Sequence, residues 1–354
     1  MILTEKVKGN FFIFLIAKLI LFSIHLFSFS SYKIILVDQY KIDQSRRVLF
    51  LPGDMAVDKN ENIYFTDRKD GNVKIYGRGG RLLRIFGKQG NGPNEFNEPF
   101  NIDVNSNIIC IFDKGNFNYF IYNKNFELIN KFFFFTDVSE FILSNNRIIS
   151  WNYFRDKRNK EYRGIIFNFK GKILKLLYNI PFDINDIENR FYLSYAFIDA
   201  NDKDQFFIIQ KKDYLVKVYN QAGEKISEFG EKPFFYKKPH LTRSYLKDLR
   251  SHQRSYKAWE SWYRDFTWVV GLSSLKNCII VALGNFNRQK GIWEYWIQLY
   301  DENGKYIDTI KLLEPGSPSE VIFLDSNNND LLFFAEATRE DLSEYKIYKY
   351  RLIL

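Results

Sequence analysis

Short apolar segments separated by polar turns recur along most of the chain. Glycine- and aspartate-rich turns such as Lys-Asp-Gly and Arg-Gly-Gly punctuate strands rather than helices. In the first such region the segments are apolar or alternate between apolar and polar residues, and they are Asp54–Val57, Asn62–Asp67, Val73–Tyr76 and Leu82–Phe86. The pattern therefore predicts a unit of four short strands.

The same unit returns at a nearly constant spacing. Its turn positions 80, 126, 171, 223 and 304 are separated by 46, 45, 52 and 81 residues, so a period near 46 with one long insertion explains every interval. Six units can be marked, with first strands starting near residues 54, 100, 140, 194, 268 and 319. Four-stranded units repeated around an axis are typical of a β-propeller. We predict an all-β fold, a six-bladed β-propeller of four-stranded antiparallel blades spanning residues 31–354.

The two ends of the repeat region are complementary. The sixth unit has only three segments, near Glu320–Leu324, Leu331–Ala335 and Tyr345–Leu352, whereas Tyr32–Tyr40 is an apolar strand with no partner in its own neighbourhood. If this N-terminal strand pairs as the outer strand of the last blade, it closes the ring and removes an exposed edge.

A glycine-rich phrase resembles a known family. The sequence Gly90-Asn91-Gly92-Pro93-Asn94-Glu95-Phe96-Asn97-Glu98-Pro99 precedes Ile102-Asp103-Val104 and a later strand that ends in Asp113; Met55–Asp58 and Ile63–Asp67 match the same phrase in blade 1. This phrase resembles that of the NHL-repeat six-bladed propellers, including their secreted bacterial relatives. In blades 3 and 4, Asn152 and Gln210 stand where the strand-ending aspartate would be. The glycine-rich loop has no P-loop Lys-Ser/Thr, so we interpret it as a crossover between blades, with Phe96 packing between them and Pro99 starting a strand.

The first thirty residues have the layout of a secretory signal. Lys6 and Lys8 precede an apolar stretch, 11–29, that is interrupted by Lys18 and His25. Ser28 and Ser30 fit a small-x-small cleavage site, which predicts export to the periplasm, the cell surface or the exterior. The alternative is an uncleaved membrane anchor formed by residues 11–30, although Lys18 disfavours it.

Composition narrows the class of protein. The 354 residues are 46% hydrophobic and 18% aromatic, which excludes a disordered or low-complexity chain. The net charge is +9, of which +2 lies in residues 1–30. The two cysteines, Cys110 and Cys278, cannot form a disulfide framework, and their expected positions on the second strands of opposite blades are too far apart for a bond.

The insertion at residues 231–266 breaks the repeat between blades 4 and 5. From Thr242 onward its aromatic and apolar residues recur at helical spacing, and its net charge over 231–265 is +5. The stripe either packs on the propeller rim or channel mouth, or forms a lid or docking element. Trp259, Trp262 and Arg264 are the candidates for binding, because Trp and Arg are enriched at binding hot spots.

Two other loops are expected on the same face. They carry Arg155 and Arg158 in blade 3 and Arg288 in blade 5, and with the insertion they predict a basic, aromatic ligand-binding sector. Acidic residues of blade 6 and of the segment before blade 4 oppose this charge. A mixed face argues against broad nucleic-acid binding, which needs many phosphate contacts.

A polar ring is expected where the central channel opens. Repeat alignment places Asp54, Asn101, Glu140, Ser194 and Glu320 near the starts of inner strands. Asp54, Asn101, Glu140 and Glu320 offer the oxygen ligands that Ca²⁺ prefers, in an arrangement similar to that of lactonase-type propellers. The alternative is that the channel is simply wet and polar.

Three functions follow. The first is an exported, non-enzymatic and monomeric propeller that binds a protein, peptide or glycan through its loop-rich face. The second is a metal-dependent hydrolase or lyase at the channel mouth, and the third is an NHL-type RNA-binding propeller. The histidines expected in the mature chain, His240 and His252, both lie in the insertion, and neither is near a Ser or Cys in a recognisable nucleophile motif, so no catalytic residue is assigned. No cofactor is expected other than Ca²⁺.

Overall fold

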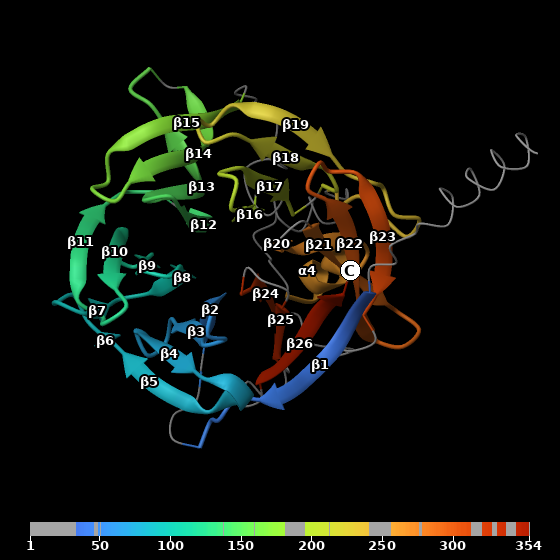
Figure 1. Ribbon diagram of the computed structural model, residues 1–354, viewed down its shortest axis with the longest axis horizontal. Coiled ribbons are helices and arrows are strands. Elements are labelled where there is room, and N and C mark those ends of the chain that lie inside the picture. Colours follow the sequence, from blue (N-terminus) through green and yellow to red (C-terminus); the bar gives the residue numbers. More distant parts are fainter. Residues whose placement is uncertain are drawn as a thin grey trace, which may run out of the picture.

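Six four-stranded antiparallel sheets form a ring, as Figure 1 shows, which confirms the predicted six-bladed β-propeller. The computed structural model describes residues 33–45, 49, 51–136, 138–158, 160–180, 195–211, 213–240, 256–275, 278–312, 321–327, 331–337 and 345–353. Within each of the first five blades, consecutive strands pair from the inner strand to the outer strand.

The first three blades follow the predicted repeat closely. Blade 1 contains β2 (Pro52–Val57), β3 (Ile63–Asp67), β4 (Asn72–Tyr76) and β5 (Leu82–Phe86). Blade 2 contains β8 (Pro99–Val104), β9 (Ile108–Asp113), β10 (Asn118–Asn123) and β11 (Leu128–Phe133). Blade 3 contains β12 (Val138–Ser144), β13 (Arg147–Arg155), β14 (Glu161–Asn168) and β15 (Ile173–Ile180).

The next two blades flank the insertion. Blade 4 contains β16 (Ala196–Ala200), β17 (Phe206–Gln210), β18 (Val216–Tyr219) and β19 (Lys225–Phe229). Blade 5 contains β20 (Thr267–Leu275), β21 (Cys278–Asn287), β22 (Ile292–Asp301) and β23 (Tyr306–Lys311). Cys110 and Cys278 thus lie on the second strands of blades 2 and 5, as predicted, and both are buried thiols outside any disulfide.

The N-terminal strand closes the ring. Blade 6 contains β24 (Val321–Ser326), β25 (Leu331–Ala337) and β26 (Tyr345–Ile353), and its fourth strand is β1 (Lys33–Lys41). β1 pairs antiparallel with β26 from Lys33 opposite Ile353 to Lys41 opposite Lys346. In Figure 1 the blue β1 lies beside the red β26, so the strand expected from the sequence does complete the last blade.

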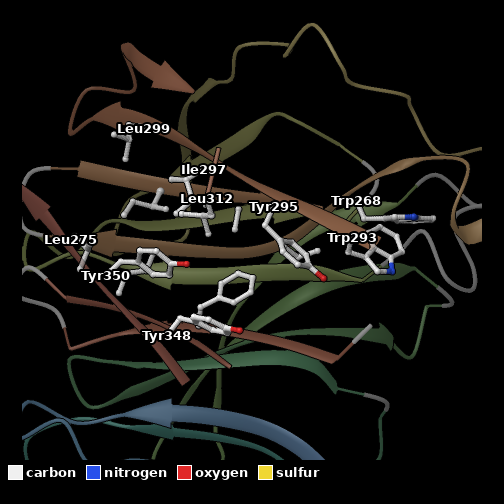
Figure 2. Packing of buried hydrophobic residues seen from close by; sticks show 14 of the residues in the cluster. Trp268, Leu275, Trp293, Tyr295, Ile297, Leu299, Leu312, Tyr348 and Tyr350 are labelled. Carbon is white, nitrogen blue, oxygen red and sulfur yellow. The ribbon is translucent and has the colours of Figure 1, made fainter. Parts of the chain in front are cut away.

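The core consists of six apolar clusters, one between each pair of neighbouring blades. Figure 2 shows the cluster between blades 5 and 6, where Tyr295 and Ile297 of β22 face Tyr348 and Tyr350 of β26. The rings of Tyr295 and Phe334 meet edge to face at 5.1 Å. Aromatic side chains suit these interfaces because they fill much space with few flexible bonds. The high aromatic content of the chain is therefore used largely between blades.

The glycine-rich loop is a crossover from blade 1 to blade 2, as predicted. Two short strands, β6 (Lys88–Gln89) and β7 (Glu95–Phe96), pair in parallel within it, and a 3₁₀ turn, η1 (Arg78–Gly80), precedes β5. Phe96 is fully buried in the cluster between blades 1 and 2, and Pro99 starts β8. Gly87 has a φ of +85°, and a Cβ there would lie 2.5 Å from the Phe96 ring, so only glycine fits at this position.

The described part of the insertion contains one helix, α4 (Tyr256–Tyr263). The rest of the predicted helical stretch, residues 241–255, lies outside the described residues, as does the predicted signal or anchor, residues 1–30. In the portion of the chain that the structure describes, no helix is long and apolar enough to cross a membrane.

Candidate functional site: an acidic central channel

A cavity of about 240 Å³ lies at the propeller axis. All six blades contribute to its wall, because each inner strand runs along the axis. The described lining residues are Gly53, Asp54, Met55, Ala56, Phe100, Asn101, Ile102, Asp103, Ser139, Glu140, Phe141, Ile142, Tyr195, Phe197, Ile198, Asp199, Leu272, Leu324 and Asp325. Five of them are carboxylic acids, and none is Lys, Arg or His.

The crossover face is the face of the propeller on which the inner strands begin. Asp54, Asn101 and Glu140 lie near the starts of β2, β8 and β12, so the structure brings three predicted site residues to the wall of one cavity. Tyr195, just before β16, also lines this cavity and is 42% exposed. The cavity therefore reaches the surface on the crossover face. Ser194 and Glu320, the other members of the predicted ring, lie outside the described residues.

Three deeper aspartates were missed from the sequence as site residues. Asp103, Asp199 and Asp325 are the penultimate residues of the inner strands in blades 2, 4 and 6. A signal for them exists, because an apolar residue followed by aspartate recurs at this point in alternate blades. Repeat alignment at the ends of the inner strands, rather than only at their starts, would have found it.

The aspartates of the channel connect neighbouring blades. The backbone N–H groups of Leu143, Ser274 and Val57 donate to Asp103, Asp199 and Asp325 respectively, each from the following blade. The Ile102 N–H of blade 2 donates in the same way to Asp54 of blade 1. The nitrogen-to-oxygen distances are 2.5–3.1 Å. These four carboxylates therefore have a structural role as well as lining the channel.

Burial shifts the titration of all five acids upward. Desolvation raises the pKa of Asp54 and of Asp199 to about 7, and the pKa of Asp103 to about 6. It also raises the pKa values of Glu140 and Asp325 well above their usual range. The negative charges of all four aspartates add to the effect at Glu140. Each of the five residues keeps partial exposure to the cavity, so water there still reaches the ionised forms.

Asn101 has an unpaired acceptor in this wall. The residue is 3% exposed, and its Nδ2 donates to the Ser139 carbonyl oxygen at 3.3 Å. Its Oδ1 is buried and has no hydrogen-bond partner in the described structure. Because a carbonyl oxygen can only accept, the contact with Ser139 fixes which end of the amide is the donor. Oδ1 therefore keeps a free acceptor site, while the Asn101 side chain also hydrogen-bonds the Asp54 carboxyl group.

Three of the four residues predicted to hold a metal, Asp54, Asn101 and Glu140, line the cavity, and the fourth, Glu320, lies outside the described residues. Among the residues that the structure describes, no group of three or more His, Cys, Asp or Glu side chains is placed to hold a metal ion. The Ca²⁺ prediction therefore has no geometric support from Asp54, Asn101 and Glu140, and Glu320 is not described. The prediction remains untested.

Two arginines of the predicted basic sector form ion pairs near the described end of the insertion. Arg264 pairs with Glu260 at 2.7 Å and lies over the Phe286 ring, and Arg288 of the blade 5 loop forms an ion pair with Asp265. These contacts fasten the end of α4 to blade 5.

The two tryptophans and the remaining arginines have different positions. Trp262 is 4% exposed, and its Nε1 donates to the His240 carbonyl oxygen at 2.8 Å. The cluster between blades 5 and 6 buries the Trp262 side chain, which gives no support to its predicted contact with a partner, and that binding role stays a prediction. Trp259 lies in α4, and its side chain is outside what the structure describes. Arg155 and Arg158 are exposed at the end of β13 and in the loop after it.

Comparison with known proteins identifies the fold. No family model matches the chain, and no curated protein matches it. A member of the DUF4221 family from Bacteroides vulgatus is 12% identical with a TM-score of 0.68, and the match covers 92% of this chain and 99% of that one. A presumed exported protein of Bacteroides fragilis is 13% identical with a TM-score of 0.61, over 92% and 97% of the two chains.

These likenesses show the fold alone. Virginiamycin B lyase from Staphylococcus aureus is 10% identical over 91% of this chain and 100% of its own, but its TM-score of 0.47 supports no further statement. Propellers host many unrelated activities, so function must be argued from the site. The resemblance to NHL repeats has no family match behind it and stays a prediction.

Proposed function

We propose that this protein is an exported, non-enzymatic β-propeller that binds a protein, peptide or glycan partner on its crossover face, over the mouth of the central channel. The cavity at the axis carries the proposal. It has a volume of about 240 Å³, it reaches the surface beside Tyr195, and it is lined by polar groups from several blades. A concave site with a few convergent polar groups is the usual form of a binding site.

The described lining residues favour binding over catalysis. They include no histidine or cysteine. Ser139 is the only serine or threonine among them, and its hydroxyl group donates a hydrogen bond to the Trp151 carbonyl oxygen at 3.0 Å. Catalysis by a serine or cysteine nucleophile needs a base such as histidine within hydrogen-bond reach, and the described lining contains no such pair. The carboxylates also disfavour the RNA-binding alternative, because they repel phosphate.

Ligand selection with a matched pair of substitutions tests this proposal. Displayed peptides and immobilised glycans are selected on the parent protein and then bound to Tyr195→Ala, at the cavity mouth, and to Tyr306→Ala, on the outer strand β23. Both tyrosines are about equally exposed, at 42% and 37%. We expect selected ligands to lose affinity for Tyr195→Ala and to keep it for Tyr306→Ala. Equal binding to the two variants would refute a binding site at the mouth.

The exported state rests on the sequence of residues 1–30. Sequencing the N-terminus of the protein recovered from cell-envelope and culture fractions tests it directly. A mature chain that begins near Ser31 supports cleavage and export, whereas an intact N-terminus in the membrane fraction supports the anchor instead.

A further inference from the structure

The wall of the channel mouth has a surplus of hydrogen-bond acceptors. Asn101 is only 3% exposed, and its buried Oδ1 has no hydrogen-bond partner among the residues that the structure describes. An unpaired buried acceptor costs about 1–3 kcal/mol, so a hydrogen-bond donor at this oxygen stabilises the site. The amide nitrogen of Asn101 is already committed to the Ser139 carbonyl oxygen, which prevents the amide from turning to remove the deficit.

The carboxylate beside it is also without a donor. No hydrogen bond from a described residue reaches the Glu140 side chain, whereas each of the four aspartates accepts a backbone N–H from a neighbouring blade. Ionised Glu140 and the Asn101 oxygen can only accept hydrogen bonds. With no basic residue among the described lining, a ligand that satisfies the Asn101 oxygen and ionised Glu140 brings several donors and a positive charge.

The size and lining of the cavity favour an organic cation over a bare metal ion. The volume of about 240 Å³ is many times that needed for one water molecule, and among the described residues no set of acidic side chains is grouped tightly enough for a metal. Phe100 and Tyr195 add aromatic rings to the wall. The Phe100 ring already has Arg68 at 4.9 Å and Lys114 at 5.0 Å from its centre, so Tyr195, which is 42% exposed, is the aromatic ring that a ligand cation can contact.

We propose that the channel mouth binds an arginine or lysine side chain that a partner polypeptide inserts, with Glu140, Asp54 and Asn101 Oδ1 as its acceptors. This rests on the proposed function and narrows the partner to one that presents a basic side chain. Guanidinium carries five N–H donors and ammonium three, and neither has an acceptor, which complements this wall.

Calorimetric titration with four probes tests the chemistry. The probes are Nα-acetyl-arginine amide, Nα-acetyl-lysine amide, Nα-acetyl-citrulline amide and calcium chloride. Citrulline has nearly the shape of arginine without the charge, so it separates charge from fit. We expect at least one basic probe to bind and citrulline to bind at least about tenfold more weakly. Equal binding of citrulline, or calcium binding that excludes the basic probe, would overturn the proposal.

The substitution Glu140→Gln tests whether the basic probe binds at Glu140, and Glu228→Gln is the control. The two changes are chemically identical, but Glu228 is exposed on the outer strand β19 and pairs there with Lys225. We expect Glu140→Gln to weaken the basic probe at least about tenfold and Glu228→Gln to leave it unchanged. The same loss in both variants, or in neither, contradicts a site at Glu140. Urea unfolding of each variant shows that the fold is intact.

The pH dependence of binding gives a second readout. The groups that face Glu140 are Asp54, Asp103, Asp199 and Asp325, and their charges together with burial keep its proton bound to a higher pH than usual. Lys124 acts on Asp103 in the opposite direction. A cation must displace this proton, so affinity for the basic probe should rise from pH 5 to pH 8. Affinity that is independent of pH would contradict binding at these acids.

The two proposals fail in different ways. If no basic probe binds while the selected ligands still depend on Tyr195, the basic side chain is wrong and the binding face stands. If the basic probe binds with the expected dependence on Glu140 but the selected ligands ignore Tyr195, the partner does not use this face and the proposed function is wrong.

Discussion

At the scale of single residues, one aspartate holds two loops to the end of a strand. The Asp113 carboxylate accepts the backbone N–H groups of Asn97 and Glu98, at 2.9 and 2.7 Å, and that of Gly115 at 3.2 Å. The first two belong to the crossover that enters blade 2, and the third belongs to the loop that follows β9. Asp67 serves blade 1 similarly, since it accepts the N–H of Leu51 and of Lys69. The strand-ending aspartate of the repeat therefore has a clear physical reason.

Replacing Asp113 should destabilise the propeller. Asp113→Ala leaves at least two backbone donors at the blade entrance without their acceptor, and each such loss costs about 1–3 kcal/mol when the donor is shielded from water. We expect the free energy of unfolding, measured by urea denaturation, to fall by at least about 2 kcal/mol. Asp308→Ala on the exposed face of β23 is the control and should change it by less than about 0.5 kcal/mol. A similar loss of unfolding free energy in the two variants would show that the hydrogen bonds to Asp113 do not stabilise the propeller.

At the scale of elements, the insertion is an integral part of the blade 5 and 6 interface. Trp262 meets the Trp268 ring at 5.4 Å and the Phe266 ring at 5.7 Å, and Trp268 Nε1 donates to the Tyr263 carbonyl oxygen at 2.7 Å. The end of α4 is therefore packed as core and not presented as a docking surface.

The Trp262→Ala variant distinguishes these two roles. A buried tryptophan replaced by alanine costs about 3–5 kcal/mol, so the free energy of unfolding should fall by that amount. The basic probe should still bind to the folded fraction, because Trp262 does not line the cavity. Unchanged stability with lost ligand binding would instead restore Trp262 as a binding residue.

The sequence predicted repeated elements better than it predicted the site. The spacing of the apolar strands was enough to predict the six blades, because it depends only on the local sequence pattern. The need to cover an exposed strand edge was enough to predict the pairing of β1 with β26. The boundaries of β5 match the sequence prediction, and those of the first strand of blade 1 differ by two residues at its start.

The candidate site depended on information that a linear pattern does not hold. Alignment of strand starts predicts Asp54, Asn101 and Glu140 at one opening, but it does not include Asp103 and Asp199, which lie near the other ends of inner strands. Burial of Trp262 depends on how α4 meets blade 5, which the spacing of its aromatic residues cannot specify. The unpaired Asn101 oxygen follows from the distance between two blades, so only the folded structure reveals it.

At the scale of the whole molecule, the ring gathers five carboxylates around one axis. Their raised pKa values mean that the folded protein holds protons which the unfolded chain releases at lower pH. Stability falls with increasing pH wherever the folded state binds more protons than the unfolded state. The contribution of these acids is therefore fully present below about pH 4, where unfolded carboxyls are protonated. It is lost progressively as the pH rises through their raised values, which for Asp54 and Asp199 are about 7.

The contribution of Glu140 to this pH dependence can be measured separately. The test compares the melting temperatures of Glu140→Gln and the parent protein between pH 4 and pH 8.5. At pH 4 Glu140 is protonated and resembles glutamine, so the two proteins should melt together. As the pH rises, only the parent must either keep a proton or place a charge among four aspartates, so Glu140→Gln should become the more stable protein. Glu228→Gln should show the opposite trend, because Lys225 lowers the pKa of Glu228. Adding the basic probe at pH 8 should raise the parent's melting temperature and narrow its gap to Glu140→Gln, since a ligand stabilises the state that binds it. If the difference in melting temperature between the parent and Glu140→Gln does not change with pH, the charges of the four aspartates do not raise the pKa of Glu140.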